Sequence, residues 1–222
     1  MLDYERDGVA VGGGVVGADV LEKLAEEFDE AGVRVGARPF ALSATIKQLV
    51  MPDGILTRMA IEWAGTDARP VRVLAFDKRP EANWHLPWHQ DRVIAVKRRI
   101  DLPDYGNWTV KNGQPHVEAP TRLLETMFNL RLHIDDCDAE NGALKVIRGS
   151  HRLGRLSDAQ VREAAAHGPA MICAMPAGGI LAMKALTLHA SDASKSPRRR
   201  RVLHVDYCFG ELPKGLDWAL DL

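Results

Sequence analysis

Apolar positions follow two different periods along this chain. In Asp19 to Phe28 they recur at helical spacing, which predicts an amphipathic helix. Pro52 and Asp53 are good starting residues for a second helix, and Gly65 would end it. From Val71 onward, short apolar runs are separated by Gly, Pro, Asn and Asp, a pattern typical of an all-β sandwich or barrel. The sequence therefore predicts a β-rich protein with supporting helices near its start.

The β part contains seven candidate strands. They are Val71 to Phe76, Val93 to Arg99, Met127 to Ile134, Ala143 to Ile147, Met171 to Ala174, Gly179 to Ala182 and Val202 to Phe209. A short helix is expected from Asp158 to Ala166. Because no internal repeat or low-complexity linker divides the chain, we expect one domain over residues 1–222, with helical support over about 18–65. The predicted architecture is a jelly roll with flanking helices, a mainly β fold of the α+β kind.

Composition and charge argue against several classes of protein, among them membrane proteins and proteins that bind nucleic acid. Hydrophobic residues make up 46% of the 222 and charged residues 27%, as in an average globular protein. The formal net charge of −1 gives no reason to expect nucleic acid or an anionic membrane as a partner. Cys137, Cys173 and Cys208 form no C-x-x-C pair, so they predict buried thiols in a reducing compartment. Met1 to Asp7 lack the apolar core of a signal peptide and no apolar run reaches membrane-spanning length, so a cytoplasmic protein is expected.

A glycine motif near the start allows a competing interpretation. Gly12, Gly14 and Gly17 satisfy G-x-G-x-x-G, follow an apolar run and open a helix, as in a Rossmann phosphate-binding turn. A Rossmann domain, however, needs strand and helix to alternate over most of the chain, whereas everything after Gly65 is expected to form strands and turns. The pattern favours a flexible lead-in to a supporting helix over a dinucleotide site.

Three H-x-D pairs are candidates for metal binding. On an extended strand, residues i and i+2 project from the same face and can bind one metal together. An Fe(II) centre that must also bind a bidentate cosubstrate and O₂ accepts three protein ligands, typically two histidines and a carboxylate. The pairs are His89 with Asp91, His133 with Asp135 and His204 with Asp206.

The residues that follow each pair separate the three candidates. No histidine follows His204, although a jelly-roll site usually takes its last ligand from a late strand, so a polar face on the final strand is the simpler interpretation. The His133 pair could use His189, but it is followed by an acidic turn that ends a strand, and it is the weaker alternative. The first pair also has His189 downstream, and Arg200 lies eleven residues beyond that histidine.

Arg200 belongs to a basic run, Arg198 to Arg201, that needs a local explanation. 2-Oxoglutarate would chelate iron through its keto acid end and leave a second carboxylate deeper in the barrel. A buried carboxylate needs a charged, forked partner, and arginine supplies two parallel hydrogen bonds where lysine supplies a point charge. We expect one arginine of the run to point inward and the other three to lie on a solvated turn.

Several motifs together resemble the phytanoyl-CoA dioxygenase family of Fe(II)/2-oxoglutarate-dependent oxygenases, from about Ala41 almost to the C-terminus. The matching pieces are Trp88-His89-Gln90-Asp91, the segment Asp138 to Leu144, Gly149-Ser150-His151, Gly178 to Leu181, His189 and Arg200. The resemblance implies a double-stranded β-helix fold, which is a cupin-like jelly roll. It also implies Fe(II) at His89, Asp91 and His189, with the distal carboxylate of 2-oxoglutarate at Arg200.

Further roles follow from the resemblance alone. Ser191 and Gln90 match positions that contact the cosubstrate, Trp108 resembles an aromatic residue that follows the H-x-D pair, and Lys47 resembles an upstream lysine at the edge of the site. Because Asp91 is a carboxylate, the chain departs from the halogenating relatives. It is also shorter than many members of the family, and nothing in it indicates an acyl-CoA substrate.

The predicted reaction is hydroxylation of a small-molecule C–H bond, with O₂ and 2-oxoglutarate consumed and succinate and CO₂ released. Candidate substrate contacts are polar residues that flank the H-x-D pair or lie on neighbouring strands: His85, Arg92, Lys97, His116 and Arg131. We expect two of these five to line the pocket, because exposed basic residues are mostly solvated. Trp84 and Trp88 are expected to wall its entrance.

Two other functions stay open from the sequence. A cupin-type hydrolase or isomerase could use Zn or Mn at the same three residues, although it would have no need of Arg200 as a deep carboxylate partner. A jelly roll that binds a ligand without catalysis is the other alternative. Only the oxygenase predicts succinate.

Overall fold

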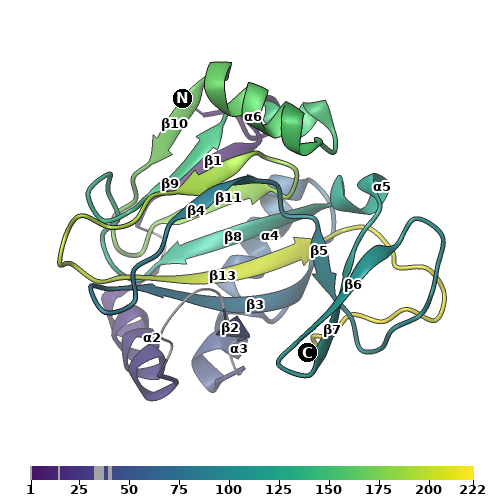
Figure 1. Cartoon of the computed structure of the whole chain (residues 1–222). Coiled ribbons are helices and arrows are strands. Elements are labelled where there is room, and N and C mark those ends of the chain that lie inside the picture. The colour runs from purple at the N-terminus through teal and green to yellow at the C-terminus, as the bar shows by residue number, and fades with distance from the viewer. Residues whose placement is uncertain (1, 15, 33–37, 40–41) are drawn as a thin grey trace.

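Two facing β-sheets form the body of the molecule (Figure 1). The computed structural model describes residues 2–14, 16–32, 38–39 and 42–222. The larger sheet has the strand order β1-β11-β8-β13-β3-β2, and the smaller has the order β10-β9-β12-β4. A third sheet, β5-β7-β6, extends to one side (Figure 1). This is the jelly roll with flanking helices that the sequence predicts.

The strands are β1 Val9–Gly12, β2 Arg38–Pro39, β3 Arg69–Lys78, β4 Leu86–His89, β5 Val93–Ala95, β6 Gly106–Lys111, β7 Gln114–Glu118, β8 Met127–His133, β9 Leu144–Ile147, β10 Ala170–Cys173, β11 Ile180–Lys184, β12 His189–Ser191 and β13 Arg200–Cys208. The helices are α1 Tyr4–Asp7, α2 Ala18–Glu30, α3 Ala44–Val50, α4 Ile55–Ala64, α5 Thr121–Leu124 and α6 Asp158–His167, with a 3₁₀ turn at Ser150–Leu153. No helix in this described part of the chain is long and apolar enough to cross a membrane.

The helices predicted near the start are present, with one difference in their bounds. Gly65 ends α4 in a left-handed conformation at φ 66°, as expected of a glycine cap. Pro52 and Asp53, however, lie in the turn before α4, and Gly54 is the residue that precedes its first turn. The helix α3 was not predicted, because its seven residues are too few to show a clear period.

The dinucleotide interpretation of the glycine motif is wrong. The strand β1 that precedes it pairs antiparallel with β11, with Val9 opposite Met183 and Gly12 opposite Ile180. A Rossmann turn joins a strand of a parallel sheet to its crossover helix. Gly17 serves instead as the residue before α2.

The long central strands are covered on both faces, which explains why β8 is buried along its whole length. On β13, Leu203, Val205 and Tyr207 face outward into the main apolar core beneath α2, α3 and α4. The residues between them face the barrel interior, where His204 lies opposite Leu74 and Arg131 in the sheet. The interior face is strongly polar. It carries Arg72, Lys78, Asn129, Arg131, His133, Arg200, His204 and Asp206, all but Arg72 buried.

The outer core gives a stability prediction. Phe28 is fully buried where α2 packs on the larger sheet. Replacing it by alanine leaves a cavity that the rigid sheet cannot fill, so we expect the free energy of unfolding to fall by about 3–5 kcal/mol. Urea unfolding measures the change. Lys23→Ala, an exposed position on the same helix, is the control and should shift stability by no more than about 0.5 kcal/mol. An unchanged urea midpoint for Phe28→Ala would contradict the placement of α2.

All three cysteines are buried, and none is joined to another. This confirms the prediction of buried thiols.

Candidate metal centre

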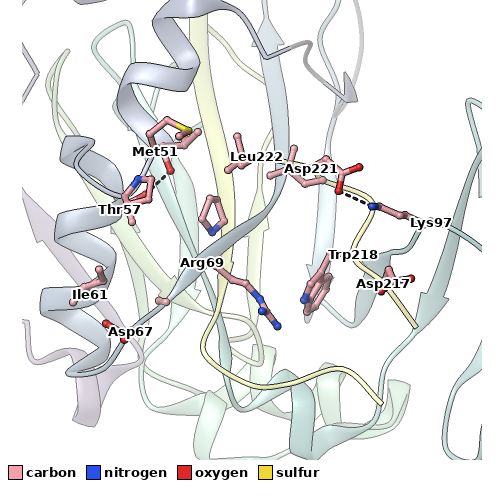
Figure 2. A pocket seen from close by; sticks show the side chains of 15 residues that line it. Met51, Thr57, Ile61, Asp67, Arg69, Lys97, Asp217, Trp218, Asp221 and Leu222 are labelled. Carbon is pink, nitrogen blue, oxygen red and sulfur yellow. Dashed lines mark hydrogen bonds and ion pairs between the residues drawn. The ribbon is translucent and has the colours of Figure 1, made fainter. Parts of the chain in front are cut away.

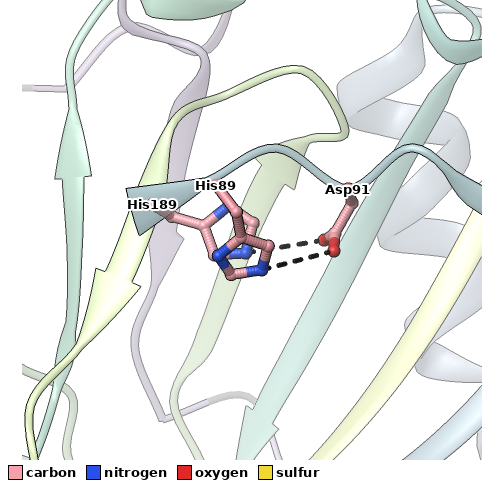
Figure 3. Close-up of side chains that lie close together, drawn as sticks. All are labelled: His89, Asp91 and His189. Atoms are coloured by element: carbon pink, nitrogen blue, oxygen red, sulfur yellow. Dashed lines mark ion pairs between the residues drawn. The ribbon is translucent and has the colours of Figure 1, made fainter. Parts of the chain in front are cut away.

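Two histidines and an aspartate converge on the inner side of the smaller sheet (Figure 3). His89 ends β4 and His189 begins the neighbouring β12, where the two residues pair directly across the strands. Asp91 follows β4 by two residues. One possible ligand atom from each side chain lies within 4.8 Å of the others. The three residues that the sequence predicts as one site therefore meet in space.

The backbone fixes which nitrogen of each histidine faces the aspartate. Nδ1 of His89 donates to the carbonyl of Pro87 at 2.8 Å, and Nδ1 of His189 donates to the carbonyl of Thr187 at 2.9 Å. Each Nε2 then keeps its lone pair, and these atoms lie 3.9 Å and 3.7 Å from the carboxylate oxygens of Asp91. Such bonds from the second ring nitrogen set the tautomer and orientation that metal-binding histidines need. Burial lowers the pKa of His189 to about 3, so the ring is neutral at ordinary pH.

A second cluster, which we call the basic cluster, consists of Lys78, Ser191 and Arg200. Nη1 of Arg200 and Oγ of Ser191 both donate to the carbonyl of Gly142, at 2.7 Å and 2.8 Å. Nζ of Lys78 donates to Ser191 Oγ at 3.0 Å and to the carbonyl of Asp192 at 2.6 Å. Lys78 and Arg200 pair across β3 and β13. Two buried basic side chains thus lie side by side, and both contact groups around Ser191, which is two residues beyond His189 in β12.

No carboxylate of the described residues neutralises the basic cluster. Arg200 is 3% exposed, and its Nε atom is buried without a hydrogen-bond partner. Burial, followed by the charge of Arg200, lowers the pKa of Lys78 to about 7. An unpaired buried cation costs several kcal/mol of desolvation, so such a site is stabilised by a bound anion. A carboxylate is the anion that best matches a guanidinium such as that of Arg200.

The other three arginines of the basic run point away from the barrel interior. We expected them to be solvated, but each forms an ion pair with an aspartate. Arg198 pairs with Asp138 at 2.6 Å. Arg199 pairs with Asp77 and Asp29, and Arg201 pairs with Asp135. Arg200 alone of the four turns into the barrel, as predicted.

Of three further residues expected at the cosubstrate, two lie away from the metal cavity and one, Gln90, lines it. Lys47 is exposed on α3, which packs on the outer face of the larger sheet, and the lysine found in the barrel is Lys78. Trp108 lies on β6 beneath Arg99, 5.5 Å from the guanidinium, and does not line the metal cavity. Gln90 lines that cavity, but its amide is bonded to the backbone of Gly154, Leu186 and Leu156. In the structure, Gln90 therefore holds the segments around Leu156 and Leu186 together.

The metal cavity, of about 420 Å³, contains two of the five candidate substrate contacts, Arg92 and Arg131. His85 is exposed beside Asp192, and His116 lines a neighbouring cavity of about 360 Å³. Trp84 lines the metal cavity, with Nζ of Lys78 5.0 Å from its ring centre. We expected two of the five candidates to line the pocket, and two do; their contact with a substrate stays a prediction.

Lys97 lies in a different hollow, between α4, the start of β3 and the C-terminal segment (Figure 2). At about 570 Å³ this hollow is larger than the metal cavity. Two of its charged residues pair with each other, since Lys97 bonds Asp221 at 2.6 Å. Because its lining brings together no set of metal ligands, size alone does not make it the reaction site.

The other two H-x-D pairs are built into the barrel without forming a metal cluster among the described residues. His133 is buried and its Nδ1 donates to the carbonyl of Arg131, whereas Asp135 pairs outward with Arg201. His204 and Asp206 are hydrogen-bonded to each other at 2.7 Å. The polar face predicted for the final strand exists, and it is turned toward the interior.

A cupin-like barrel with two histidines and a carboxylate at one end and a buried arginine deeper inside defines the class of Fe(II)- and 2-oxoglutarate-dependent enzymes. The family model described as "Phytanoyl-CoA dioxygenase (PhyH)" matches residues 4–202. The chain belongs to the phytanoyl-CoA dioxygenase family, and it is a non-haem iron enzyme that uses 2-oxoglutarate. Comparison with curated protein sequences gives no match.

Solved structures share the fold at low sequence identity. AviO1 from Streptomyces viridochromogenes Tue57 is 20% identical with a TM-score of 0.63, over 95% of this chain and 93% of that one. The epimerase SnoN, crystallised with Fe³⁺, alpha ketoglutarate and nogalamycin RO, is 20% identical with a TM-score of 0.68, over 92% and 80%. HygX from Streptomyces hygroscopicus, with nickel and 2-oxoglutarate bound, is 16% identical with a TM-score of 0.65, over 92% and 84%.

Proposed function

We propose that this enzyme hydroxylates a C–H bond of a small molecule, with Fe(II) held by His89, Asp91 and His189. The distal carboxylate of 2-oxoglutarate would bind the basic cluster. The observation that supports this most strongly is Arg200, a buried guanidinium with a partnerless Nε and no carboxylate beside it. Charge-assisted, forked hydrogen bonds to a carboxylate would satisfy it.

The protein's own groups have defined tasks in this proposal. Bound Fe(II) and 2-oxoglutarate supply the oxidising chemistry, in which O₂ is consumed and succinate and CO₂ leave. His89 and His189 present neutral Nε2 atoms, because their Nδ1 protons are held by backbone carbonyls. Asp91 supplies the negative charge that a divalent cation favours. Arg200 and Ser191 orient the cosubstrate from its far end.

Among the possible oxidative outcomes, hydroxylation needs the fewest additional reactive side chains in the cavity. One similar structure is described as an epimerase and another as a carbocyclase, so the fold is compatible with other oxidative outcomes. Epimerisation needs a group that returns a hydrogen atom to carbon, and a phenol or thiol is best suited to that task. The described residues that line the metal cavity include no tyrosine and no cysteine.

Succinate formation tests the proposed function. Purified protein with Fe(II), ascorbate, 2-oxoglutarate and air should release succinate slowly without substrate and faster when the substrate is present. The control is the same mixture without O₂, which should give none. A turnover that proceeds without O₂ and with Zn or Mn would favour the cupin-type hydrolase or isomerase. Failure to bind 2-oxoglutarate at all would favour the non-catalytic jelly roll.

Lys78 predicts a pH dependence of cosubstrate binding. Its pKa of about 7 in the free protein means that binding of a carboxylate above pH 7 must first restore the proton. The affinity for 2-oxoglutarate should therefore fall as pH rises above 7, by up to about tenfold per unit. Calorimetric titration of the Mn(II) protein between pH 6 and 9 measures it. Lys78→Met should bind more weakly at pH 6 and lose the dependence.

The same residue predicts an opposite effect on stability. Because the folded-state pKa lies below the ordinary 10.5, the unfolded chain binds more protons between pH 7 and 10.5. The free energy of unfolding should therefore increase as pH rises through this window. Below pH 7, where Lys78 is charged in both states, the charge destabilises the folded protein most. Lys78→Met should stabilise the ligand-free protein more at pH 6 than at pH 9. A wild-type affinity that does not vary with pH would contradict both statements.

A further inference from the structure

The metal cavity is lined by more cations than anions. Its cationic residues are Arg72, Arg92, Lys111 and Arg131, and the only acidic residue among its lining is Asp91. Two of these cations, Arg72 and Arg92, have a carboxylate partner that is not part of the cavity lining. Nε of Arg72 bonds Asp206 at 2.5 Å, and Nε of Arg92 lies 3.3 Å from Glu118. Lys111 is exposed at the rim.

Arg131 differs from its neighbours because it has no carboxylate partner among the described residues. The side chain is buried, 5% exposed, on the interior face of β8. Its guanidinium carbon lies 5.1 Å from the ring centre of Phe76, and Nη1 is 3.1 Å from Nδ1 of His204. Burial lowers its pKa only to about 10, so the charge persists at neutral pH. A full positive charge therefore lines the cavity beside the metal ligands.

A chain of hydrogen bonds holds Arg131 in place. Asp206 accepts from Arg72 and from Nε2 of His204, the latter at 2.7 Å. With its proton on Nε2, His204 offers the lone pair of Nδ1 to Arg131. This uses one of the five donors of the guanidinium. The remaining donors are fixed in direction and open to a ligand in the cavity.

The charges of the proposed complex leave Arg131 unbalanced. Fe(II), Arg200 and protonated Lys78 bring four positive charges, and Asp91 with the two carboxylates of 2-oxoglutarate brings three negative ones, so this group leaves no negative charge over for Arg131. Arg72 is matched by Asp206, whereas Glu118 is shared by Arg92 and Arg155, at 3.3 Å and 2.8 Å. A buried charge that stays unpaired is costly, and a planar guanidinium is best satisfied by a carboxylate in the forked arrangement.

We propose that Arg131 recognises a carboxylate of the substrate, so the enzyme acts on an anionic small molecule. This inference rests on the proposed function, because it takes the iron and cosubstrate charges from it. His204, Asp206 and Arg72 are positioning residues that aim Arg131. Lys111, at the open side, adds to the field that draws the anion in.

Matched ligand pairs test the substrate class. The protein loaded with Mn(II) and 2-oxoglutarate is heated with a panel of small carboxylic acids and with the primary amide of each. At least one acid should raise the melting temperature while its amide does not. Arg131→Gln should weaken binding of that acid by at least about tenfold, and Arg131→Lys by less, since it keeps the charge without the fork. Arg122→Gln, an exposed arginine, is the matched control.

The affinity of each variant for 2-oxoglutarate separates the two possible sources of the carboxylate. Arg131→Gln should change it by no more than about threefold, far less than Arg200→Gln. A loss as large as that of Arg200→Gln would assign Arg131 to the keto acid end of the cosubstrate and overturn the proposal. So would a panel in which no acid is favoured over its amide. If wild-type protein fails to bind 2-oxoglutarate, the proposed function itself has failed, and that failure is visible before the panel is used.

Discussion

Replacing His189 by alanine should abolish succinate formation, to below about one-thousandth of the wild-type rate. The residue contributes one of the three possible protein ligands among the described residues, and its Nε2 atom is 3.7 Å from Asp91. Loss of even an outer hydrogen-bond partner of a metal site typically costs 10- to 100-fold in metal affinity. Loss of a ligand should therefore cost more than about 100-fold, which Fe(II) or Mn(II) titration would show directly.

The control for this variant is His167→Ala. His167 is exposed on the last turn of α6 and bonds a carbonyl of its own helix, so the same chemical change should leave turnover and metal affinity unaltered. His89→Ala, at a partly exposed position on β4, guards against a folding defect at the buried His189. Full turnover in both histidine variants would show that the metal site lies elsewhere.

Arg200→Gln should raise the dissociation constant for 2-oxoglutarate by about 100-fold or more. Two charge-assisted hydrogen bonds are each worth about 1.5–3 kcal/mol, and 1.4 kcal/mol is tenfold in affinity. The same change should stabilise the ligand-free protein, because it removes a buried cation that has no carboxylate partner. If Arg200→Gln binds 2-oxoglutarate more weakly but melts at a higher temperature, Arg200 serves ligand binding and not stability.

Calorimetric titration and thermal unfolding of the same preparation measure both effects. Arg198→Gln is the neighbouring control, since Arg198 pairs with Asp138 on the surface. It should change neither quantity by much, because exposed ion pairs contribute about 0–1 kcal/mol. An Arg200 variant that binds 2-oxoglutarate normally would remove the main support for the proposed function.

The sequence predicts local features of this protein well and cross-sheet neighbours poorly. The H-x-D spacing and the downstream histidine predicted that His89, Asp91 and His189 meet, as the resemblance also implied, although Asp91 lies two residues beyond the end of β4. Lys47 and Trp108 were chosen by counting along the chain from a motif, and intervening loops of different length moved both away from the cavity.

Lys78 was missed although a signal for it exists. It shares the inward face of β3 with Arg72 and Phe76 by simple alternation, but only the pairing of β3 with β13 brings it beside Arg200. Strand order is set by the whole fold and not by local pattern. The same is true of Arg131, which was one polar candidate of five until its burial and its bond to His204 set it apart.

The ion pairs of Arg198, Arg199 and Arg201 also affect how anions reach the enzyme. Left unpaired, the three of these arginines that lie outside the barrel would create a positive patch that attracts 2-oxoglutarate away from the site. Pairing three of them with Asp138, Asp77 and Asp135 cancels that outer potential. The uncompensated charge of this segment is then that of Arg200 inside the barrel, so the segment attracts an anion to the interior and not to the outer surface.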